Sequence, residues 1–232
     1  LLTQKEVKKL KRLALLVIIG LLVSCSGLAL AGISGSKHDL SLVTEESQVC
    51  IFCHTPHGAT TQGPLWNREA SAVAYIPYSS GSLNANIEEF ASGQGLADGS
   101  SGDLCLSCHD GTVAVNSLMN SSTNAGNPAM QPDLPQFLEG KIIGADNLGS
   151  NLSNDHPINF IYDAALASAD GGLVTPYSER RVKETVDLPL FNGKMQCSTC
   201  HDVHEPGGTA DKEPFLRVSM YQSGLCLECH LK

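Results

Sequence analysis

The sequence predicts a mostly irregular chain with short α-helices and little β-structure. Phe, Trp and Tyr make up only 5% of the 232 residues, whereas the chain holds 22 Gly and 11 Pro. Apolar residues recur with neither a helical nor a strand period over most of the chain. Because the burial of large side chains normally offsets the entropy lost on ordering, a polypeptide of this composition needs bound groups to complete its core.

One five-residue motif, Cys-x-x-Cys-His, occurs four times and predicts what those groups are. This motif is the attachment site of c-type haem. Its two thiols each form a thioether with one vinyl group of the porphyrin, and the histidine that follows becomes the proximal ligand of the iron. The sequence therefore predicts four covalently bound haems c at the core of a multihaem cytochrome c. They would be held by Cys50, Cys53, Cys105, Cys108, Cys197, Cys200, Cys226 and Cys229, with His54, His109, His201 and His230 on the irons.

Pairs of Cys-x-x-Cys also form zinc sites or redox dithiols, and a single pair in a cytosolic protein would favour those interpretations. Here a histidine follows every pair, and eight of the nine cysteines belong to the motifs. The ninth, Cys25, lies in a segment expected to be removed or lipidated, so no thiol remains for a structural disulfide. A zinc or disulfide protein is the alternative interpretation.

The remaining histidines match the remaining axial positions. The chain has eight His, and the four outside the motifs are His38, His57, His156 and His204. Four irons with one open position each would use all of them, which predicts bis-histidine ligation throughout. The alternative sixth ligands are the thioethers of Met119, Met130, Met195 and Met220, which would raise the reduction potential.

Two of these histidines follow a proximal histidine by three residues. They are His57 after His54 and His204 after His201. The sixth ligand must approach from the opposite face of the porphyrin, and three residues cannot carry the chain around its edge. His57 and His204 must therefore serve other haems, which predicts macrocycles nearly in contact.

Residues 1–31 are typical of an export signal. Five Lys and Arg precede the apolar run Leu13 to Val23, and Ala29-Leu30-Ala31 is a small-residue cleavage site. The alternative is a lipobox that ends at Cys25, whose acylation would attach the protein to a membrane. Both interpretations place the protein outside the cytoplasm, and residues 32–232 then form a single tetrahaem domain.

The chain without residues 1–31 is acidic. It keeps 10 basic and 23 acidic residues, a formal charge of −13. A surface of this sign repels nucleic acid and anionic lipid, so neither is expected as a partner. It suits cationic partners or metal ions, although acidic balance also serves solubility.

Three segments resemble multihaem cytochromes c: Leu104 to Gly111, Gly193 to His204 and Asn154 to Pro157. The layout as a whole is similar to the tetrahaem subunits of extracellular cytochrome filaments of metal-reducing bacteria. That resemblance implies a head-to-tail polymer with a continuous haem stack and one axial histidine supplied by a neighbouring subunit. His38, on an arm near the expected start of the exported chain, is the candidate for this role, with ligation inside its own subunit as the alternative.

These features predict an electron-transfer protein and not an enzyme. The first hypothesis is an extracellular or outer-surface conduit that passes electrons to metal oxides, partner cells or other cytochromes. The second is a monomeric periplasmic shuttle, similar to tetrahaem cytochromes c3. The third is a multihaem reductase, which would need an iron without a distal ligand.

Local patterns predict a few elements. Short helices are expected after several motifs, and Ile87 to Phe90 suggests one helical turn. Asn192-Gly193 predicts a turn.

Overall fold

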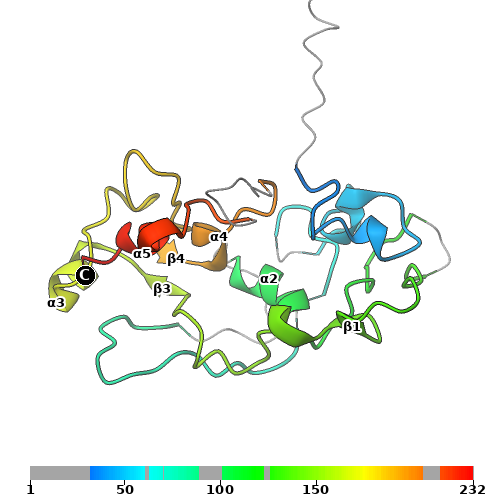
Figure 1. The fold of residues 1–232 in the computed structure, drawn as a ribbon, viewed down its shortest axis with the longest axis horizontal. Helices are drawn as coiled ribbons and strands as arrows, with labels where there is room; N and C mark the ends of the chain where they lie inside the picture. The colour runs from blue at the N-terminus through cyan, green and yellow to red at the C-terminus, as the bar shows by residue number, and fades with distance from the viewer. Residues whose placement is uncertain are drawn as a thin grey trace, which may run out of the picture. The chain divides into compact units, whose positions relative to one another are not determined.

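The first cysteine of each Cys-x-x-Cys-His motif lies on a short helical segment. In the computed structural model these segments are the 3-10 helix η2 (Val49–Phe52) and the helices α2 (Gly102–His109), α4 (Cys197–Cys200) and α5 (Gly224–Leu227) (Figure 1). The structure describes residues 32–60, 63–69, 71–88, 101–122, 126–205 and 215–231, which belong to one compact unit, Gly32–Lys232. The expected export signal, with Cys25, lies outside the described residues.

The other helices are equally short. Helix α3 (Ala164–Asp170) begins where the Asp163 side chain accepts the N–H of Leu166 and ends at Gly171, whose φ of 69° is typical of a helix C-terminus. The 3-10 helices η1, η3 and η4 span Leu40–Leu42, Gly144–Asp146 and Tyr221–Ser223. Within the described residues, every helix is too short or too polar to span a membrane.

Two antiparallel strand pairs supply the β-structure. Strands β1 (Phe137–Leu138) and β2 (Lys141–Ile142) pair Phe137 with Ile142. Strands β3 (Phe160–Ile161) and β4 (Lys194–Met195) pair Phe160 with Met195. The predicted turn at Asn192-Gly193 is confirmed, because both residues have positive φ and the flanking Phe191 and Lys194 exchange backbone hydrogen bonds of 3.0 Å.

The placement of the helices differs from the prediction. The helical residues coincide with the motifs or lead into them, instead of following them. The turn expected from Ile87 is wrong for the residues described, because Ile87 forms an antiparallel bridge with Phe160 and the Glu88 N–H donates to Asn159 O at 3.0 Å. Phe90 lies outside the described residues.

The largest apolar cluster gathers around β3 and β4. It consists of Phe160, Tyr162, Val182, Leu188, Leu190 and Met195, with Leu225 and Cys229 from the α5 region packed against it. In Figure 1, α4 and α5 lie close to these two strands. This cluster positions the last two motifs.

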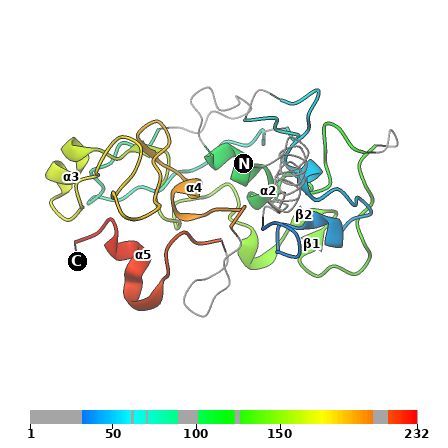
Figure 2. The same ribbon diagram turned by 90° about the horizontal axis from the view of Figure 1, so that it is seen from above.

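A second buried region positions the first two motifs. Phe52 of η2 and Leu106 of α2 are each only 1% exposed, as is the charged side chain of Arg68. Figure 2 shows β1 and β2 beside α2, and the N–H of Val115 donates to Gly140 O between β1 and β2 at 2.8 Å. Across the described residues, 13 buried polar side chains accompany 13 buried apolar ones, so this interior is far less apolar than an ordinary core.

Candidate haem sites

The four motifs share one backbone geometry. In three of them the histidine N–H donates to the carbonyl oxygen of the first cysteine at 2.9 to 3.0 Å, in the pairs His54 and Cys50, His201 and Cys197, and His230 and Cys226. The remaining motif, at residues 105–109, lies inside α2. Because residues i, i+3 and i+4 share one face of a helix, each turn presents both thiols and the imidazole to the same side. A porphyrin attached at its edge and ligated at its iron requires this arrangement.

Three of the motif histidines face a histidine from outside the motifs. The ring centroids of His54 and His204 are 6.4 Å apart with planes 18° from parallel. Those of His38 and His109 are 6.1 Å apart, and those of His156 and His230 are 6.3 Å apart. Each pair therefore joins one predicted proximal ligand to one predicted distal ligand.

These separations fit two imidazoles on one iron. Metal–imidazole nitrogen bonds are about 2 Å long, so two rings on opposite sides of one metal have centroids about 6 Å apart once the half-width of each ring is added. Ordinary aromatic contacts cover a wider range, about 4.5–7 Å. The identity of the partners is more decisive than the distance, because each pair matches a motif histidine with one of the four other histidines.

Backbone carbonyls orient three of these rings. The Nδ1 atom of His54 lies 2.9 Å from Pro64 O, that of His109 lies 2.8 Å from Asp146 O, and that of His156 lies 2.9 Å from Pro157 O. A carbonyl oxygen can only accept, so Nδ1 carries the proton in each case. The lone pair then resides on Nε2, the nitrogen that a metal would bind.

His38 is held in place and kept neutral. Its segment is fixed by hydrogen bonds from Gly32 N to His204 O (2.9 Å) and from Gly35 N to an Asp39 carboxylate oxygen (2.7 Å). Burial, with smaller contributions from neighbouring histidines, lowers the pKa of His38 to about 4. The arm that carries His38 is therefore anchored. The neutral His38 imidazole could ligate iron without first losing a proton.

Two site histidines lack such a partner. His57 and His201 are exposed, and neither ring contacts another histidine in the described part of the chain. The surroundings of the His201 ring nevertheless keep part of its water away, which lowers its pKa, and His109 adds to the effect. The motif at residues 197–201 therefore lacks a second histidine from the described residues.

The thiols of successive motifs are neighbours. Burial raises the pKa of Cys53 to about 12, and Cys108 of the second motif adds to the effect. The Cys105 and Cys197 thiols hydrogen bond to each other, which together with burial raises the pKa of Cys105. In the same way Cys200 has Cys226 of the last motif as a neighbour. The attachment sites therefore follow one another in space in the order of the sequence.

The methionines have other environments. Met195 is part of the apolar cluster and only 4% exposed, whereas Met119 and Met220 are 46% and 39% exposed. Met130 forms a backbone bridge with Thr44.

Trp66 packs its ring against His54, with centroids 6.0 Å apart.

Sequence reasoning missed the residues that join the first two motifs. Asn67 and Arg68 are buried and hydrogen bond to backbone carbonyls of both motifs. The available signal was a charged residue two positions after the single Trp, in a segment otherwise interpreted as a loop.

No protein-family model matches the chain, and no curated protein matches it.

Proposed function

We propose that the chain is a tetrahaem c-type cytochrome that transfers electrons and catalyses no bond chemistry. The three histidine pairs at 6.1 to 6.4 Å carry this proposal. Haem c, when bound, supplies one-electron oxidation and reduction of iron. The eight motif thiols would hold the haems covalently, and the paired imidazoles would occupy both axial positions and so exclude external ligands.

The order of the motifs supports a role as a conduit. The Cys105 and Cys197 thiols hydrogen bond between the second and third motifs, and electrostatic effects reach from Cys108 to Cys53 and from Cys226 to Cys200. Residues that hold redox groups in such a series favour transfer from one end of the chain to the other. We infer that the protein acts at the outer surface or outside the cell, with metal oxides or other cytochromes as redox partners, and the periplasm is the alternative location.

A second copy of the chain would supply the missing ligand at residues 197–201. The contact between His38 and His109 favours ligation by His38 within its own subunit. His57 is exposed and has no histidine partner among the described residues, as is true of His201. We therefore assign to His57, in place of His38, the role of ligand to the neighbouring subunit in a head-to-tail filament.

Two substitutions distinguish His57 from His38 as the ligand to the neighbouring subunit. His57→Ala should give unpolymerised protein with four attached haems, one of them high-spin. His38→Ala should also produce one high-spin haem but leave the filaments intact. Mass spectrometry gives the haem count, electron paramagnetic resonance gives the spin states, and electron microscopy shows the polymers. A wild-type protein with fewer than four haems contradicts the proposed function, and filaments that survive His57→Ala contradict the role of His57.

The unpaired His201 also supports a second candidate, a reductase. An iron held by His201 alone would offer an open position to a small ligand such as nitrite or peroxide. Carbon monoxide binding by one haem of the native protein would favour this candidate, whereas a native protein with four low-spin haems contradicts it. A monomer with four low-spin haems would favour the periplasmic shuttle.

A further inference from the structure

Arg68 is a buried guanidinium group without an acidic partner. Its Nη1 donates to Val115 O at 2.7 Å, and its Nη2 donates to Ala114 O at 2.8 Å and to Ser107 O at 3.5 Å. Its Nε has no hydrogen-bond partner. Among the described residues, no carboxylate forms an ion pair with it. Because Arg stays protonated in proteins, a full positive charge is held in the interior by backbone dipoles alone.

The preceding residue fixes this charge to the first motif. The Asn67 N–H donates to Cys53 O at 3.0 Å, and the Asn67 Nδ2 donates to Ile51 O at 2.7 Å. The Asn67 side chain is completely buried. The backbone that carries Arg68 is therefore tied directly to the attachment site at Cys50 to His54.

The guanidinium itself reaches the second motif. Its acceptor Ser107 lies between the two cysteines of that motif and is fully buried. Arg68 and its neighbour Asn67 are thus hydrogen bonded to the backbone of both motifs, and the guanidinium lies between the first two predicted attachment sites.

A fixed positive charge in a poorly solvated interior raises the reduction potential of a nearby iron. Ferric iron carries one more positive charge than ferrous iron, so a neighbouring cation disfavours the oxidised state. Local charge and burial are among the factors that set haem potentials. A buried, unneutralised charge is costly to retain, which makes a specific role of this kind a reason for its presence.

We propose that Arg68 raises the reduction potentials of the two haems attached at residues 50–54 and 105–109, relative to the two attached at 197–201 and 226–230. This inference rests on the proposed function, since it requires haem at these motifs. Arg68 would act on the two irons through its charge and would not ligate them. The result is a difference in potential along the series, with the first two sites more easily reduced than the last two.

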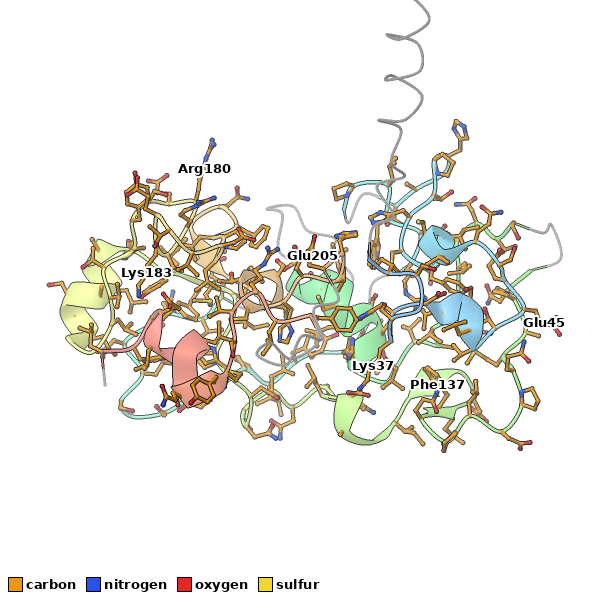
Figure 3. The ribbon with its side chains drawn as sticks, turned by 45° about the horizontal axis from the view of Figure 1, so that its top comes forward. Lys37, Glu45, Phe137, Arg180, Lys183 and Glu205 are labelled. Carbon is orange, nitrogen blue, oxygen red and sulfur yellow. The ribbon has the colours of Figure 1, made fainter. Side chains whose placement is uncertain are left out.

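Three variants of the full-length holoprotein test the proposal. Arg68→Gln removes the charge but keeps an amide donor, Arg68→Lys keeps the charge, and Arg180→Gln removes the charge of an exposed side chain that Figure 3 shows pointing away from the body of the unit. Spectroelectrochemical titration should show two of the four midpoint potentials shifted downward in Arg68→Gln. The potentials of Arg180→Gln should equal those of the wild type, and Arg68→Lys should restore the two shifted values at neutral pH.

The outcomes separate the two proposals. Fewer than four haems in the wild type contradicts the proposed function itself. Four haems with unchanged potentials in Arg68→Gln overturn the role of Arg68 alone, as does a shift of equal size in Arg68→Lys that stays the same at acidic pH, where the lysine is protonated. If Arg68→Gln does not load haem, Arg68→Lys decides, because a buried ammonium group loses its proton more readily than an exposed one. Its two potentials should then fall at alkaline pH where those of the wild type do not, and pH-independent potentials overturn the proposal.

Discussion

The orientation of single imidazole rings decides whether this chain can hold iron without a preformed pocket. A histidine ligand needs its lone pair on the nitrogen that faces the metal, and a hydrogen bond at the other nitrogen selects that tautomer. Carbonyl oxygens of Pro64, Asp146 and Pro157 provide this bond.

Replacement of one distal histidine should change one haem only. In His204→Ala the iron opposite His54 would lose its sixth ligand, so we expect one of the four haems to become high-spin and to bind carbon monoxide. The His204 side chain is exposed, so the loss of its protein contacts alone should change the free energy of unfolding by less than about 0.5 kcal/mol. Any further change would come from the lost bond to iron. Electron paramagnetic resonance and carbon monoxide difference spectra measure the effect. Glu205→Ala, at the exposed neighbouring position, is the control and should leave all four haems low-spin.

The residue types of the sites could be predicted from the sequence, but the pairing of the histidines could not. The motifs predict which thiols and proximal histidines would hold haem, because the five-residue spacing already contains that chemistry. The match of His54 with His204 depends on the path of the intervening loops, which no local pattern encodes. For the same reason the sequence suggested His38 as the ligand for a neighbour, whereas its backbone is anchored beside His109.

At the scale of elements, a buried carboxylate fixes the segment that leads into η2. Oxygens of Glu46 accept hydrogen bonds from the Gln48 N–H (2.8 Å), the Ser122 N–H (3.3 Å) and the Ser122 hydroxyl. Burial alone would raise the pKa of Glu46, but these bonds outweigh it and hold the pKa below its ordinary value of 4.5. The ionised form of Glu46 therefore stabilises the fold.

Glu46→Gln should lower the free energy of unfolding by about 2 kcal/mol at pH 7, the usual size for hydrogen bonds to a charged group. A carboxyl group with a depressed pKa contributes stability that is present above its unfolded pKa and is lost as the pH falls through its folded pKa. The difference from wild type should thus shrink below about pH 4.5. Urea denaturation at pH 7 and at pH 3.5 measures it. Glu45→Gln changes an exposed side chain, labelled in Figure 3, and should have little effect at either pH.

Elements with strong local signals could be predicted, and those set by distant contacts could not. Asn192-Gly193 forms its turn because both residues tolerate positive φ. Ile87 is extended because it pairs with Phe160, a partner that the sequence near Ile87 does not reveal. Helical turns coincide with the motifs because the histidine N–H closes a turn onto the first cysteine, a backbone bond that side-chain periodicity does not indicate.

At the scale of the whole molecule, the polypeptide alone supplies little driving force for folding. Its largest apolar cluster contains six buried residues, and polar side chains occupy half of all the buried positions in the described residues. Loops rich in Gly and Pro connect the elements and carry a large conformational entropy in the unfolded state. The stability of the holoprotein must therefore depend on groups that link distant segments, and each proposed bis-histidine iron would link two of them.

Removal of the haems should consequently abolish cooperative folding and not merely weaken it. We expect protein from which haem has been released by silver-salt cleavage of the thioethers to show no cooperative thermal transition, a loss of the whole unfolding free energy, which is about 5–15 kcal/mol for natural domains. Circular dichroism and calorimetry measure the transition, with holoprotein carried through the same buffers as the control. The apolar cluster around β3 and β4 is the part expected to persist, because none of its six buried residues is a predicted haem-binding cysteine or histidine. An apoprotein with a sharp transition and native hydrogen-exchange protection at Asn67 would mean that backbone hydrogen bonds, and not bound haem, join the first two motifs.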